Sequence, residues 1–236
     1  MNRQRVQRML ITSCSSILAI FVALVICAII LLVTGKDPFK AYSTLFGALG
    51  DTNVIQSTLN RATPLMISAA AVAFGFKMNL FNIGVEGQMR VALLTTAVLG
   101  SHVSLPAPIH VVFCFVVAMA TGALWALIAG YLKVRRGVNE VISTIMLNFI
   151  ALSVVAWAFD SFFRVKSDTA ELLVKTKELP RSAWFPYLVD GRLSGMFLIA
   201  VLVLVVFWVV VWKTRFGFQL RASGQNAGAA RATGVD

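Results

Sequence analysis

The stretch Ile11–Val33 reads ITSCSSILAIFVALVICAIILLV and carries no charged side chain. A helix needs about 20 predominantly apolar residues to cross the roughly 30 Å hydrocarbon core of a bilayer. The basic stretch Asn2–Arg8 precedes it, as in a signal peptide. The apolar run is longer than a signal-peptide h-region, however, and no A-x-A-like cleavage site follows it. The stretch is therefore predicted to be a retained first span, with its N-terminus in the cytoplasm.

The composition of the whole chain agrees with a membrane protein. Its 236 residues are 58% hydrophobic and 13% charged, with a mean hydropathy of +0.83. A soluble domain is about half apolar and about a quarter charged. So little charge excludes a soluble enzyme, a disordered chain and a fibrous protein. The three cysteines form no CxxC pair, which excludes a disulfide framework and a zinc site.

The net charge of +11 comes from basic clusters at the ends of apolar runs. These clusters are Arg3, Arg5 and Arg8; Lys133, Arg135 and Arg136; and Lys213 and Arg215. The positive-inside rule places such clusters on the cytoplasmic side of the membrane. No basic stretch is interleaved with aromatic residues as a nucleic-acid platform requires. Membrane lipid, and not nucleic acid, is the expected neighbour of these charges.

Further apolar stretches predict about six crossings in total. They are Pro64–Phe76, a run that resumes at Val91, Pro108–Leu132, Val138–Phe159 and Leu193–Trp212. Lys36–Arg61 is expected to be an outer-face loop with a short interfacial helix, Phe162–Arg192 a polar segment, and Lys213–Asp236 a cytoplasmic tail. The predicted fold is an all-α polytopic transmembrane bundle that forms one domain over residues 1–236.

The stretch Phe81–Gln88, FNIGVEGQ, separates the second and third apolar stretches. Pro64–Phe76 is too short to cross alone, and a short apolar segment followed by a glycine-containing polar break is typical of a discontinuous helix. In that interpretation Asn82 caps the second half-helix, Glu86 lies near its positive end, and a substrate path is lined by Asn79, Asn82, Glu86 and Gln88. The alternative is a plain inner-face loop between two ordinary helices, and spacing alone does not choose between them.

The tail 217–234 reads GFQLRASGQNAGAARATG. Asn226 is a good N-cap for a helix of about two turns, and Gly234 can take the left-handed position after it. Such a short helix is marginal in water, so physical chemistry alone favours a frayed tail. A short helix with only alanine on its surface would also fit a groove on a partner.

The remaining polar residues favour structural roles. Asn139 and Glu140 fit the start of a helix, Asn148 fits a bond to a neighbouring helix, and His102 and His110 fit an interface beside the Pro106 turn. The sequence contains no HExxH, no Gly-x-Ser-x-Gly and no P-loop. No catalytic or metal site is therefore predicted, and any energy from ATP has to come from a separate subunit.

Three segments in order resemble bacterial ABC importer permeases. They are PLMISAAAVAFGFKMNLFNIGVEGQ, which starts at Pro64, GVNEVISTIMLNFIAL at Gly137–Leu152, and GFQLRASGQNAGAARATGV, which starts at Gly217. The family is the one shared by ribose, branched-chain amino acid and nucleoside importers. The pairing of the first two segments looks most like the nucleoside, or simple-sugar, branch. Members of this family are usually longer, so the chain resembles the N-terminal two-thirds of a permease.

The resemblance implies a nucleoside importer of the bacterial cytoplasmic membrane that works by alternating access. The expected partners are a cytoplasmic ABC ATPase that binds the ATP, a second permease that completes a heterodimer, and an external substrate-binding lipoprotein. The permease itself is expected to hold no cofactor. The tail 217–234 corresponds to the cytoplasmic coupling segment that docks on the ATPase. Its matching residues are Arg221, Gly224, Asn226, Ala229, Ala230 and Gly234.

Other functions remain open on the sequence. Ribose or branched-chain amino acids are alternative substrates within the same family. An ATP-independent secondary transporter could use Glu86 for ion coupling, because ionisable residues within a membrane are functional suspects. That transporter would have no use for a coupling segment. A membrane enzyme is disfavoured by the missing catalytic groups.

Overall fold

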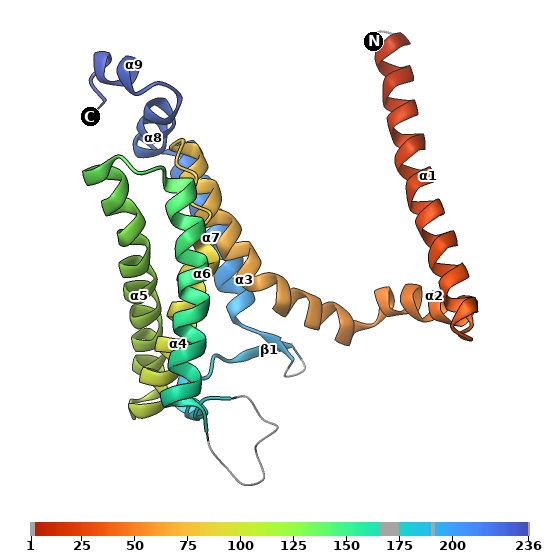
Figure 1. The fold of residues 1–236 in the computed structure, drawn as a ribbon, viewed down its shortest axis with the longest axis horizontal. Helices are drawn as coiled ribbons and strands as arrows, with labels where there is room; N and C mark the ends of the chain where they lie inside the picture. Colours follow the sequence, from red (N-terminus) through yellow and green to blue (C-terminus); the bar gives the residue numbers. More distant parts are fainter. Residues whose placement is uncertain (1–2, 166–174, 190–191, 236) are drawn as a thin grey trace. The chain divides into compact units, whose positions relative to one another are not determined.

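The computed structural model describes residues 3–165, 175–189 and 192–235, and most of them are helical (Figure 1). The helices are α1 (Arg3–Val33), α2 (Pro38–Gly47), α3 (Thr52–Lys77), α4 (Val85–His102), α5 (Ala107–Arg136), α6 (Glu140–Ala158), α7 (Met196–Lys213), α8 (Arg215–Gln225) and α9 (Ala227–Ala232). Three single turns lie at Ala48–Gly50, Phe159–Phe163 and Arg181–Ala183. The strands β1 (Tyr187–Val189) and β2 (Leu193–Ser194) pair antiparallel. The all-α prediction is confirmed.

Four of the described helical stretches are long and apolar enough to cross a membrane. They are Ser15–Val33, Ala107–Arg136, Glu140–Phe163 and Met196–Lys213. The protein is therefore a multi-pass membrane protein. Helices α3 and α4 carry more polar residues and fall outside this set, so six crossings and a broken second span remain predictions.

Residues Met1–Thr58 form one compact unit. Asp37 starts α2, because its carboxylate accepts the backbone N–H of Phe39 at 2.9 Å. The Tyr42 hydroxyl donates to the carbonyl of Leu24 and so attaches α2 to α1. A short helix in the stretch expected to be a loop is thus confirmed.

Helix α3 is longer than the sequence suggested. It begins at Thr52, not at Pro64, and it runs unbroken to Lys77. The Asp51 carboxylate accepts the N–H of Asn53 at 2.8 Å and so provides the start signal. Pro64 lies inside the helix, where a proline removes one i→i−4 hydrogen bond but leaves the rest of the ladder in place.

Residues Leu59–Asp236 form the second compact unit. Helix α4 packs on α5 and α6, and α7 packs on α8. Asn60 of α3 donates to the carbonyl of Arg192 at 2.7 Å and accepts the N–H of Ser194 at 2.9 Å. At its other end, the Lys77 ammonium lies 5.1 Å from the ring centre of Trp212. Between Asn60 and Lys77, α3 therefore runs parallel to α7.

A second set of contacts fixes α4 to its neighbours at the end away from Lys77. His110 in the first turn of α5 is fully buried. Its ring nitrogens lie 2.9 Å from the carbonyl of Gly100 and 2.8 Å from the hydroxyl of Ser182. The carbonyl only accepts, so Nε2 carries the proton that faces Gly100. The His110 ring thus joins α4, α5 and the turn Arg181–Ala183, a contact that the sequence did not predict.

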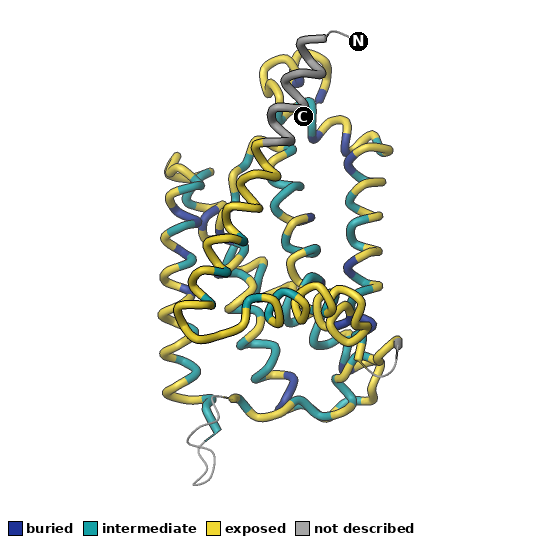
Figure 2. The backbone as a smooth tube through the Cα atoms, turned by 90° about the vertical axis from the view of Figure 1, so that its right-hand side faces the viewer, coloured by how far each residue is buried: buried dark blue, intermediate teal, exposed yellow. Residues whose placement is uncertain are grey.

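Few side chains in the described residues are buried, and they are mostly small (Figure 2). Ala151, Ala200 and Val211 are fully buried. Small residues at helix contacts allow close approach of backbones, as is usual in membranes. Large apolar side chains cover the outside of the helices instead, where a bilayer solvates them.

Candidate functional site

The segment 78–84 joins α3 to α4 and opens with a tight turn. Leu80 N–H donates to the carbonyl of Gly75 at 3.0 Å, and Asn79 N–H donates to the carbonyl of Phe76 at 3.1 Å. This pair of bonds is a Schellman motif, which needs a left-handed residue after the helix. Asn79 supplies it with a φ of 58°. Its exposed side chain makes Asn79 a turn residue in this structure.

Substitution of Asn79 separates a backbone role from a side-chain role. Asn79→Gly keeps the left-handed backbone available, so we expect unchanged stability and uptake. Asn79→Val forces a β-branched residue into that region and is expected to cost about 1–3 kcal/mol. Thermal unfolding in detergent measures the stability of each variant, and uptake of labelled substrate measures its transport. A loss of uptake in Asn79→Gly at normal stability would return the Asn79 side chain to the substrate path.

Asn82 forms hydrogen bonds with the start of α4 but is not its N-cap. Gly84 occupies the N-cap position, which corrects the assignment of Asn82 as the cap. The Asn82 side-chain oxygen accepts the N–H of Gly84 at 2.9 Å and the side-chain amide of Gln88 at 3.3 Å. Two of the four predicted path residues thus lie together.

Gln88 reaches the wall of a cavity of about 560 Å³. Helices α3, α4 and α5 form most of the wall of this cavity, which is almost wholly apolar. Apart from the Gln88 amide, its polar side chains are the hydroxyls of Ser68 and Thr96. Asn82 lines a smaller cavity of about 170 Å³, together with Lys133, Glu140 and Thr144. The hydrogen bond between Asn82 and Gln88 therefore links the edges of two cavities.

Glu86 does not line either of these cavities. It lies in the first turn of α4, as expected. Its carboxylate pairs with Arg90 at 2.7 Å, and its side chain is 60% exposed. An exposed pair of this kind contributes about 0–1 kcal/mol. The four predicted path residues thus do not converge on one point of this chain.

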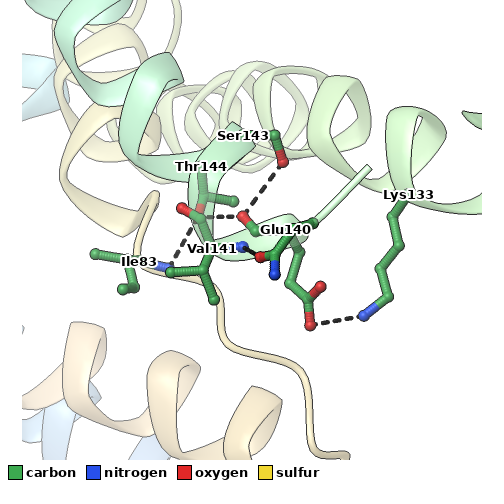
Figure 3. A network of polar contacts seen from close by, with 7 residues as sticks. Ile83, Lys133, Glu140, Val141, Ser143 and Thr144 are labelled. Atoms are coloured by element: carbon green, nitrogen blue, oxygen red, sulfur yellow. Dashed lines mark hydrogen bonds and ion pairs between the residues drawn. The ribbon is translucent and has the colours of Figure 1, made fainter. Parts of the chain in front are cut away.

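Side chains of α6 hold the segment in place (Figure 3). Thr144 accepts the N–H of Ile83 at 3.3 Å. Asn148 donates to the carbonyl of Ile83 at 2.8 Å and accepts the N–H of Gly87 at 2.9 Å. The bond from Asn148 to a neighbouring element is confirmed. The role of Thr144 was not predicted, since threonine inside an apolar helix usually bonds its own backbone.

The start of α6 follows its sequence signals. Asn139 caps the helix by accepting the N–H of Val141 at 2.9 Å. Glu140 in the first turn pairs with Lys133 of α5 at 2.6 Å (Figure 3). The structural roles predicted for Asn139 and Glu140 are therefore confirmed.

Helix α8 is attached to the ends of α3 and α7. Thr214 caps it by accepting the N–H of Gly217 at 3.0 Å. Arg221 donates to the carbonyl of Val211, and its guanidinium carbon lies 4.4 Å from the ring centre of Trp212. Gly224 lies against the backbone of Lys77 and Met78. Arg221 and Gly224 thus fix α8 to the membrane helices.

Helix α9 has the cap and the terminal turn expected from the sequence. The Asn226 side chain accepts the N–H of Ala229 at 3.0 Å. Gly234 takes a φ of 79°, and Val235 N–H closes the turn on the carbonyl of Ala230 at 3.0 Å. Ala230 is buried whereas Ala229 is exposed. Of the six predicted coupling residues, Ala229 therefore presents an outward methyl group.

The described residues bring no three His, Cys, Asp or Glu side chains together as metal ligands. The polar side chains at 78–88 and in α8 are amides, the Glu86 carboxylate paired with Arg90, the Ser223 hydroxyl and arginine guanidinium groups. These groups suit hydrogen bonding and docking.

Comparison with known proteins gives related sequences along most of the chain. The chain is 36% identical over 93% of its length to the guanosine ABC transporter permease protein NupP of Bacillus subtilis, and covers 63% of it. It is 30% identical over 93% of its length to the nucleoside ABC transporter permease protein NupB of Lactococcus lactis, covering 62%. A glucose ABC transporter permease protein of Haloferax volcanii, TsgB13, is 32% identical over 93% of the chain, which covers 60% of that protein.

The chain thus spans somewhat less than two thirds of the length of these relatives. No solved structure matches it. Residues 54–236, which contain the break and the tail described above, match a family of transport permeases. The chain belongs to the family described as the permease component of branched-chain amino acid transport systems.

Proposed function

We propose that this chain is the membrane-spanning permease subunit of an ATP-driven ABC importer. The observation that carries the proposal is the 36% identity to the guanosine permease NupP along 93% of the chain. The substrate class we propose is nucleosides or related ribosyl compounds. Simple sugars are the second candidate, because the glucose permease TsgB13 is 32% identical to this chain.

The proposed coupling segment comprises residues 217–234, which extend from within α8 through α9. Helix α9 packs on α8 and exposes Ala229 and Arg231, whereas Ala230 is buried. A small exposed helix with an apolar methyl group and one cation suits a groove on an ATPase. We propose that ATP binds to that partner, since this sequence has no P-loop.

The proposed orientation places the N-terminus and the tail in the cytoplasm. The basic residues Lys133, Arg135 and Arg136 end α5, and Lys213 ends α7. Both ends lie on the same side of the second unit, because Lys133 pairs with Glu140 at the start of α6 and segment 78–84 contacts both α6 and α8. The positive-inside rule assigns that side to the cytoplasm.

The remaining partners follow from the transporter class. We propose a second permease as heterodimer partner and an external lipoprotein that delivers the substrate. A second guanosine permease protein of Bacillus subtilis, NupQ, is 26% identical to this chain, which is consistent with two related permeases in one importer. The proposed path passes Asn82 and Gln88, with Glu86 at its cytoplasmic mouth, and Asn79 is proposed to set the turn that precedes them.

The test is labelled guanosine uptake in a bacterium that lacks nucleoside transport. The chain is expressed from its native locus with the neighbouring genes, and the partner ATPase is either intact or catalytically dead. We expect uptake that the dead ATPase abolishes and that unlabelled nucleosides compete away. Uptake that is indifferent to the ATPase would support an ion-coupled transporter instead. ATP-dependent uptake of only ribose, glucose or branched-chain amino acids would overturn the substrate class.

A further inference from the structure

The backbones of α8 and α3 meet at Gly224. A Cβ atom placed there would lie 3.0 Å from the Cα of Met78 and closer still to the carbonyl oxygen of Lys77. Only glycine fits without displacing one of the two backbones. A contact between two backbones has no flexible side chain to absorb a displacement, so a shift of α8 presses directly on the end of α3.

Side chains attach the same two helices beside this contact. The rings of Phe216 in α8 and Phe74 in α3 stack with their centres 6.5 Å apart. Lys77 of α3 and Arg221 of α8 both lie on the ring of Trp212, at 5.1 and 4.4 Å. Cation–ring contacts of this kind are attractive. The end of α3 therefore follows α8 when α8 moves in either direction.

The other end of segment 78–84 is held by a different element. Ile83 N–H donates to Thr144 of α6 (Figure 3). Asn148 of α6 bonds the carbonyl of Ile83 and the N–H of Gly87 in α4. One end of the segment is thus fixed to α8 and the other to α6. A movement of α8 relative to α6 has to be accommodated by the backbone dihedral angles of residues 78–84. Asn79 in this segment already has a φ of 58°.

We infer that segment 78–84 is the joint through which α8 moves the first turn of α4. Asn82 transmits the movement because it bonds both Gly84 and Gln88 at the start of α4. Gln88 then shifts at the wall of the 560 Å³ cavity. Packed contacts of this kind switch between discrete arrangements and do not deform continuously. The inference rests on the proposed function, since it supplies the route from the ATPase to the cavity.

The experiment measures guanosine uptake per ATP hydrolysed by the complete importer in proteoliposomes. Gly224→Ala forces α8 away from α3, and Thr144→Val removes the acceptor for Ile83 with little change in volume. Gly47→Ala and Ser143→Ala are matched controls, because a Cβ atom at Gly47 meets nothing within 4 Å and the Ser143 hydroxyl bonds only within α6. We expect each test variant to lower the uptake-to-hydrolysis ratio about threefold or more, and the controls to leave it unchanged.

The double variant Gly224→Ala/Thr144→Val decides whether one route connects the two sites. If both changes break the same joint, the uptake-to-hydrolysis ratio of the double variant is no lower than that of the single variant with the lower ratio. Losses that multiply, or a ratio equal to wild type in either single variant, would overturn the inference. Phe216→Leu, which removes the stack on Phe74 without adding volume, replaces Gly224→Ala if that variant does not assemble. A wild-type importer without ATP-dependent uptake would instead refute the proposed function itself.

Discussion

Ala229→Trp is expected to abolish ATP-driven uptake while the membrane helices stay folded. Ala229 is exposed in the middle of α9, so an indole at this position can point away from the described residues without a clash. The substitution costs the short helix about half a kcal/mol in propensity. A groove that fits a methyl group has to exclude the indole, and overpacking costs about 1–3 kcal/mol, or roughly 5- to 150-fold in affinity.

Ala230→Trp is the matched variant for this test. Ala230 of α9 is only 4% exposed, so a bulky side chain there disrupts the packing of this chain by itself. We therefore expect Ala230→Trp to lower the thermal stability of the isolated permease, and Ala229→Trp to leave it unchanged. Co-purification with the ATPase is the second measurement. If Ala229→Trp retained the ATPase and normal uptake, α9 would not be the docking element.

The caps of α9 show what a sequence can predict about such a tail. Asn226 and Gly234 were expected at the two ends of a short helix, and both are found there. Cap residues act through bonds to the nearest few backbone groups, so their pattern is readable in the chain alone. The tail forms an ordered helix pair here, not a frayed end, because α9 packs on α8 and α8 on α7. Those contacts are tertiary, and the sequence of the tail does not contain them.

The segment between α3 and α4 shows where the sequence was insufficient. Its polar residues and glycines marked the break correctly, between Lys77 and Val85. The assignment of Asn82 as the cap was wrong, because Gly84 holds the N-cap position. Side-chain direction depends on where the turn at Asn79 aims the chain, and that is set by contacts with α6 and α8. The apolar run that starts at Pro64 underestimates the length of α3, which begins at Thr52.

Asn148→Leu is expected to be the most destabilising of the substitutions in the segment and its supports. Leucine has a similar volume but leaves the carbonyl of Ile83 and the N–H of Gly87 without the partner seen here. An unsatisfied buried polar group costs about 1–3 kcal/mol. Side-chain bonds between membrane helices average only about 0.6 kcal/mol, because the released groups find other partners.

The cost of about 1–3 kcal/mol, and not the average of about 0.6, should apply to Asn148. The reason is the position of the two backbone groups that lose their partner. Ile83 belongs to the non-helical segment and Gly87 to the first turn of α4, where backbone groups lack partners within a helix. Gly87 is buried, so water cannot replace the acceptor that its N–H loses. We therefore expect a loss near the upper end of that range, about 2–3 kcal/mol, or on the order of 5–10 °C in the melting temperature of the purified protein.

Ser153→Ala on the same helix is the control for this prediction. Its hydroxyl bonds the carbonyl of Phe149 one turn earlier in α6, and that carbonyl keeps its place in the helical ladder when the hydroxyl is removed. We expect a change of about 0.5 kcal/mol or less. Asn148→Asp keeps the acceptor for Gly87 and loses the donor to Ile83, so it should melt between the two. Equal melting of Asn148→Leu and Ser153→Ala would mean that α6 does not hold the segment, and the joint between α8 and α4 would lose its fixed end.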